Sequence, residues 1–173
     1  MTFVAVLGIA LLSAGMIWAA ISDLMWFRIP NAIPILVATG FFPIALSLGW
    51  NASTILSHTL CGAAVLATCF LLFMRGYIGG GDAKLLASVA LWTGWSGLYA
   101  YVFSVSVIGG IFALSMLGIR RLPLPAKIGR FAWVSQLYNE KKHIPYGVAI
   151  GGGVFAVLKD FPQFAILFDS APS

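Results

Sequence analysis

Asp23 and Asp82 are the residues of this chain whose type and position could do chemistry. They are two of only five carboxylate side chains among 173 residues, and each lies at the edge of a long apolar run. A carboxylate beside a hydrocarbon layer is costly to maintain, which makes it a candidate functional residue. Two such groups that share one proton can hydrolyse a peptide bond, because one acts as a base on water while the other donates a proton to the carbonyl oxygen.

A glycine-rich break between two apolar runs, residues 75–84, carries Asp82 directly after three consecutive glycines. Glycines allow tight turns and the close approach of a second peptide segment. A simpler interpretation stays open, because an Asp that follows glycines is also a good helix N-cap. Asp23 could likewise cap its own helix or pair with Arg28 at an interface.

The composition indicates that membrane helices carry both acids. The chain is 61% hydrophobic and 9% charged, with a mean hydropathy of +0.99, whereas about a quarter of a soluble domain is charged. Since one membrane span needs about 20 apolar residues, the chain has room for about six spans and no separate soluble domain. We predict an all-α integral membrane protein, a single polytopic domain over residues 1–173.

The apolar runs place the spans. The first has no basic residues ahead of it, so we expect a permanent span rather than a cleaved signal. The fourth has only eleven residues, about 17 Å of helix, so it must either extend over about 82–99 or be broken or partly inserted. The sixth could continue to Phe168. The six predicted spans are 3–21, 32–48, 54–74, 85–95, 98–119 and 146–158.

The basic residues predict the orientation of these spans. The loops after the first, third and fifth spans face one compartment and hold nine of the ten Lys and Arg residues; only Lys159 lies elsewhere. The positive-inside rule then places these loops in the cytoplasm and both termini outside. Asp23 and Asp82 would lie at the same cytoplasmic edge. We attribute the positive charge to this topology and predict no nucleic-acid binding.

The longest polar segment also has a pattern. Apolar residues recur at helical spacing over 127–139, with basic residues beside them. This pattern is typical of an amphipathic helix on the membrane surface, and a solvated loop is the alternative.

The cysteines and histidines give weaker signals. Cys61 and Cys69 lie two helical turns apart in one apolar run, as expected for helix packing, and no Cys-x-x-Cys pair suggests zinc. His58 falls at the outer end of the third span and is expected at the interface, and His143 is expected to be solvated. We predict no metal and no organic cofactor.

Three stretches, in this order along the chain, resemble a known family. Asp23 at the end of a span precedes Ile29-Pro30-Asn31, Gly79-Gly80-Gly81-Asp82 fits a G-x-G-D motif, and Pro145-Tyr146-Gly147 precedes the last span. In these stretches the chain resembles the prepilin peptidases, also called type IV leader peptidases, which are G-x-G-D aspartyl peptidases. It is most similar to their short, peptidase-only members in tight-adherence (Flp) pilus systems.

The resemblance implies a function and a set of roles. Asp23 and Asp82 would be the catalytic pair, with Gly79 and Gly81 at the motif positions. The substrates would be type IV prepilins and pilin-like precursors, cleaved after a short basic leader, ahead of their apolar helix, at the cytoplasmic face of the bacterial inner membrane. The region that longer relatives use for N-methylation is not found, so we do not expect methyltransferase activity. Arg28 and Lys84 could tune the pair or contact lipid headgroups.

Other classes of function remain open at this stage. The chain could be a channel, a small-solute transporter or a pilus-assembly subunit in which Asp82 caps a broken helix and Asp23 binds a cation. Another G-x-G-D protease that acts deeper in the membrane is a nearer alternative, but it should hold its acids inside longer apolar runs. The pattern predicts no particular oligomeric state.

Overall fold

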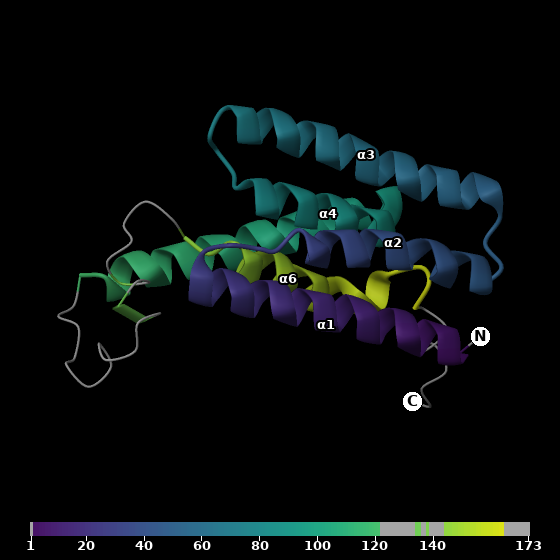
Figure 1. Cartoon of the computed structure of the whole chain (residues 1–173), viewed down its shortest axis with the longest axis horizontal. Coiled ribbons are helices and arrows are strands. Elements are labelled where there is room, and N and C mark those ends of the chain that lie inside the picture. The colour runs from purple at the N-terminus through teal and green to yellow at the C-terminus, as the bar shows by residue number, and fades with distance from the viewer. Residues whose placement is uncertain (1, 122–133, 136–137, 139–143, 165–173) are drawn as a thin grey trace.

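A computed structural model describes residues 2–121, 134, 135, 138 and 144–164 (Figure 1). Over these residues the protein is helical and has no strands, which confirms the all-α prediction. Five α-helices and one short 3₁₀ helix follow in order: α1 Thr2–Trp26, α2 Ala32–Ser47, α3 Ala52–Met74, α4 Gly80–Ile119, α6 Gly147–Val157 and η1 Leu158–Asp160.

The helices lie side by side along the long axis of the molecule (Figure 1). α1 packs against α2 and α6, and α4 packs against α2, α3 and α6. The ends of α1 and α3 and the beginnings of α2, α4 and α6 meet at one end of the bundle, while both termini lie toward the other (Figure 1). The packing of the helices therefore brings the segments that carry Asp23 and Asp82 to the same end of the bundle without long loops.

A break at Gly94 divides α4 into two halves. Gly94 has φ 60° and ψ −173°, a conformation that suits glycine because it has no Cβ. Beyond it the chain turns back toward the end of the bundle where α4 begins (Figure 1), and Leu86 and Val105 from the two halves line one cavity. The expected extension of the fourth span to about residue 99 is wrong, and the alternative of a broken helix is confirmed.

Two side chains satisfy the carbonyl groups that this break frees. His58 Nδ1 lies 2.7 Å from the Leu91 carbonyl oxygen, and Gln163 Nε2 donates to the Trp92 carbonyl oxygen at 3.0 Å. In an unbroken helix these carbonyls would bond to amides four residues later. His58 lies near the start of α3 and is only 8% exposed. It is therefore a buried residue that caps the Leu91 carbonyl of α4, and not the interfacial residue that we expected.

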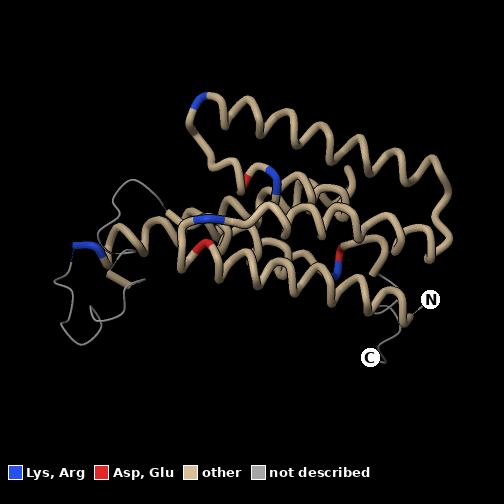
Figure 2. Tube along the Cα trace, viewed as in Figure 1, with Lys and Arg blue, Asp and Glu red and all other residues tan. Residues whose placement is uncertain are grey.

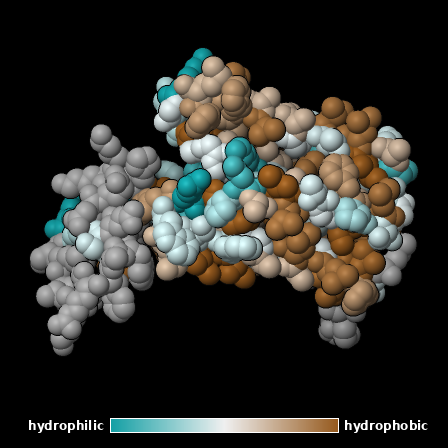
Figure 3. Space-filling model, viewed as in Figure 1, coloured by the Kyte–Doolittle hydropathy of each residue, from teal (hydrophilic) through white to brown (hydrophobic). Residues whose placement is uncertain are grey.

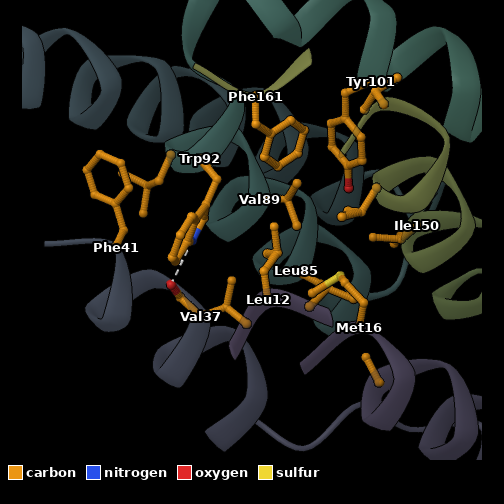
Figure 4. Close-up of a cluster of buried hydrophobic side chains, with 14 of the residues drawn as sticks. Leu12, Met16, Val37, Phe41, Leu85, Val89, Trp92, Tyr101, Ile150 and Phe161 are labelled. Carbon is orange, nitrogen blue, oxygen red and sulfur yellow. Dashed lines mark hydrogen bonds between the residues drawn. The ribbon is translucent and has the colours of Figure 1, made fainter. Parts of the chain in front are cut away.

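The core lies between α1, α2, α4 and α6 (Figure 4). Trp92 is fully buried there and donates from Nε1 to the Val37 carbonyl oxygen at 2.9 Å. Phe161 and Phe164 turn into the same core after α6. The last span does not continue unbroken toward residue 168, because α6 ends at Val157 and the 3₁₀ helix that follows ends before Phe161, which is extended.

The surface suits a membrane. Within the described part of the chain, three helices, α1, α3 and α4, are long and apolar enough to cross a bilayer, and α2 is a shorter apolar helix. Many large apolar side chains are exposed, and Figure 3 shows a largely hydrophobic surface over the body of the bundle. The chain is a multi-pass membrane protein. Six spans remain a prediction, since α6 has only 11 residues.

Charged residues gather at the end of the bundle where α4 begins (Figure 2). Arg28, Arg75 and Lys84 all lie in or beside the turns at this end, whereas Lys159 and Asp160 follow α6 at the other. This distribution matches the one from which we predicted the orientation. The predicted surface helix at 127–139 and His143 lie largely outside the described residues.

Candidate active site

Asp23 lies in the last complete turn of α1 and is held by the first turn of α6. Its side chain is 7% exposed, and Oδ2 accepts a hydrogen bond from the Gly147 backbone N–H at 2.7 Å. The unpaired N–H groups at a helix N-terminus favour a negative group there. Asp23 is thus held by Gly147 rather than by Arg28, and α1 continues past it to Trp26.

Gly147 has to be glycine for this contact. A Cβ at this position would lie 2.9 Å from Asp23 Cβ and 3.0 Å from its Oδ2, closer than side chains normally pack. We predicted no role for Gly147, although the motif Pro145-Tyr146-Gly147 was the signal that could have suggested one. Its partner is 124 residues away in the sequence.

The turn after α1 brings this region against the start of α4. Phe27 takes a positive φ of 50°, and Ser22 Oγ donates to the Arg28 carbonyl oxygen at 2.7 Å. Ile29 is buried by this turn and faces Gly81, where a Cβ would lie 3.1 Å from Ile29 Cβ. The second motif glycine therefore makes room for the turn that follows Asp23.

Asp82 is the third residue of α4. The N-cap is Gly79, so the alternative that Asp82 itself is the N-cap is wrong. Its carboxylate instead accepts a hydrogen bond from the Gly79 backbone N–H, as in a capping box. A Cβ on Gly79 would lie 2.8 Å from Asp82 Oδ2, so the first motif glycine makes room for the carboxylate.

The two acids lie at the same end of the bundle and are close enough for their charges to repel each other. A direct contact joins the segments that carry them, because Lys84 Nζ donates to Asn31 Oδ1 at 2.8 Å. Lys84 therefore connects the turn after α1 to the start of α4. This placement brings together all four residues that we predicted for the site, Asp23, Asp82, Gly79 and Gly81.

A cavity of about 420 Å³ opens beside Asp82. Tyr77 and Ile78 from the glycine-rich segment and Tyr146 from the start of α6 line it. Asp82 lines this space and is half-buried, and Asp23 is buried at the same end of the bundle. Two such carboxylates could bind and activate a water molecule that attacks a peptide carbonyl. Among the described residues, no group of three His, Cys, Asp or Glu side chains is placed to hold a metal ion.

Comparison with known proteins identifies a family. A family model described as the type IV leader peptidase family matches residues 10–114. This range is more than half of the chain and includes both Asp23 and Asp82. No curated protein and no solved structure matches the chain.

Proposed function

The chain belongs to the type IV leader peptidase family, and from this premise we propose that it is an aspartic endopeptidase whose catalytic pair is Asp23 and Asp82. Membership of this family implies a protease that acts on prepilins. The observation that supports the catalytic pair is the placement of two acids that are distant in sequence at one end of the bundle, with Asp23 buried there and Asp82 lining a cavity. A shared-proton mechanism requires two carboxylates on the same side of the membrane that can approach each other.

The proposed reaction uses the two carboxylates and one water molecule. One carboxylate takes a proton from the water, which attacks the scissile carbonyl carbon, while the protonated carboxyl donates to the carbonyl oxygen. The tetrahedral intermediate then breaks its C–N bond. The leaving amine takes up the proton that the first carboxylate received from water, and the second carboxylate regains its proton from a hydroxyl of the intermediate as the new carboxyl group forms. The hydrogen bonds from Gly147 and Gly79 hold the two carboxylates in place through this cycle.

We further propose where this cleavage occurs. The substrates are type IV prepilins, of the Flp type, and pilin-like precursors, and the bond is cut at the cytoplasmic face of the bacterial inner membrane. The basic residues Arg28, Arg75 and Lys84 at the same end as the two acids support this orientation, because positive loops stay in the cytoplasm. Lipid headgroups would surround this end of the bundle.

The test is co-expression with a Flp-type prepilin in cells that lack other prepilin peptidases. The wild-type chain should shorten the prepilin by its leader, as measured by mass spectrometry of the membrane fraction. Asp23→Asn and Asp82→Asn should each abolish processing while the protein still accumulates in the membrane. Asp160→Asn is the matched control, because this exposed carboxylate lies at the opposite end of the bundle. Normal processing by either of the first two variants would refute the proposed pair.

A further inference from the structure

An apolar groove leads away from Asp82 along the bundle. The cavity beside Asp82 shares Leu86, Val105 and Ser106 with a second cavity, also of about 420 Å³, that lies between α3 and the second half of α4. We call the two together the α3–α4 groove. It extends from Gly110 to Trp95 along one helix, which is about 22 Å at 1.5 Å per residue.

The half of the groove between α3 and the second half of α4 is lined mainly by apolar side chains, whereas Tyr77 and Tyr146 lie with Asp82 in the first cavity. Two of the hydroxyl groups that line it are already used within their own helices. Thr68 Oγ1 donates to the Ala64 carbonyl oxygen at 2.9 Å, and Ser106 Oγ donates to the Val102 carbonyl oxygen at 2.7 Å. Such a surface does not compensate the lost hydration of a polar solute, so it suits an apolar occupant.

Gly110 is not explained by the packing of the chain itself. It lines the groove beside Asp82, and a Cβ built on it would meet no atom within 4 Å. Gly109, its neighbour, does have an internal reason, since a Cβ there would lie 3.3 Å from Ala149 Cβ. In membranes, small residues on an open helix face allow the backbone of another helix to approach closely.

We propose that the α3–α4 groove binds the apolar helix of the substrate, the segment that directly follows the cleaved bond. This inference rests on the proposed function, because it assigns a place to the substrate of the same site. A helix lying in the groove would have its cytoplasmic end beside Asp82, where the leader joins it. The length of the groove corresponds to about 15 residues of helix at 1.5 Å per residue.

The first test fills the groove at Gly110. Gly110→Leu should leave the fold intact, because a Cβ at this position meets no atom of the described residues within 4 Å and leucine favours a helix over glycine. Cleavage of a full-length prepilin should fall about tenfold or more, because overpacking a helix contact is costly. Gly118→Leu is the matched control: it lies on the same helix, also meets no atom within 4 Å and does not line the groove.

The second test detects the helix directly. Both native cysteines are replaced by alanine and Asp82 by asparagine, and the prepilin carries one cysteine in its apolar segment. Oxidation should join the prepilin to Val102→Cys, which lines the groove and is 46% exposed. It should not join the prepilin to Leu71→Cys, which is 60% exposed on α3 but outside the groove.

The outcomes separate this inference from the proposed function. If the wild-type chain fails to cleave the prepilin, the proposed function itself is wrong. If the wild-type chain cleaves and Gly110→Leu cleaves equally well, only the groove assignment is wrong. The groove assignment would also be wrong if the prepilin cross-linked equally at Val102→Cys and Leu71→Cys, or at neither, since the groove would then be left to lipid. It would be wrong as well if Val102→Cys formed dimers without prepilin, which would assign the groove to a second copy of the chain.

Discussion

Gly147→Ala provides a sharp test of how α6 positions Asp23. The added Cβ would lie 2.9 Å from Asp23 Cβ, 3.0 Å from Oδ2 and 3.2 Å from Cγ, whereas ordinary contacts begin at 3.4 Å. Asp23 Cβ is fixed to the α1 backbone, so the strain cannot be relieved by a rotation at the far end of a flexible side chain. Either the carboxylate or the start of α6 has to move by about half an ångström, which weakens the 2.7 Å bond to the Gly147 N–H.

The expected loss of activity follows from this displacement. A hydrogen bond to a charged group contributes about 1.5–3 kcal/mol, and a 1 Å misplacement of a reacting group can cost about a hundredfold in rate. We therefore expect kcat/KM for prepilin cleavage by the purified enzyme to fall about 10- to 100-fold. The same clash should lower the thermal stability as well, so the rates are compared on purified, folded enzyme.

Gly152→Ala controls for the loss of a glycine from α6. Its Cβ would meet only the ends of the Ile108 side chain, at 3.3 and 3.4 Å, which can give way. We expect near wild-type cleavage from this variant. If Gly147→Ala also cleaved at the wild-type rate while accumulating normally, Gly147 would not position Asp23 and this part of the site would be wrong.

Two further predictions concern the elements around the site. Gly94→Ala should sharply lower the thermal stability in detergent, because the residue needs φ 60° and its Cβ would lie 2.5 Å from the His58 ring. Gly49→Ala is the control: Gly49 has φ 78° and its Cβ would meet no atom within 4 Å, so this variant should cost only the backbone strain. Equal losses of stability in the two variants would contradict the role of the His58 contact. Lys84→Met and Asn31→Ala should each reduce cleavage about two- to fivefold, as expected for loss of an exposed hydrogen bond of about 1 kcal/mol or less. The double variant should be no worse than either single variant, and additive losses would show that the Lys84–Asn31 contact does not act as a unit.

Much of the helix layout was predictable because hydrophobic runs have to match the bilayer. The second and third spans were predicted at 32–48 and 54–74, and α2 and α3 occupy Ala32–Ser47 and Ala52–Met74. The placement of Asp23 and Asp82 at one end also followed from the alternation of spans. These features depend on the composition of each apolar run and on the number of spans between two residues, so predicting them needs no information about contacts.

The break in α4 could be suspected but not located from the sequence. Gly94 lies in the short fourth run and Gly97 just after it, and only the structure shows that Gly94 takes the positive φ. The caps on the freed carbonyls come from His58 and Gln163, which lie on other segments. A histidine near the end of an apolar run looks interfacial until the carbonyl that it satisfies is known.

The contacts that hold the two acids in place could not be predicted from the sequence either, because they also come from other segments. Asp23 depends on Gly147, and the turn that follows it depends on Gly81. Both contacts join segments that are far apart in the sequence, so the motifs that contain Gly147 and Gly81 mark these residues without showing what they contact. The motif glycines were expected to help a substrate approach, whereas the structure shows that Gly79 and Gly81 are needed inside the site itself.

The most direct test of the central claim is the cleavage rate of the purified double variant Asp23→Asn/Asp82→Asn beside the two single variants. Two residues that act as one catalytic unit give non-additive losses. We therefore predict that the three variants fall to the same residual rate on a Flp-type prepilin, with unchanged accumulation in the membrane. A single variant that retains cleavage, or a double variant whose loss is the product of the two single losses, would contradict a shared role for Asp23 and Asp82.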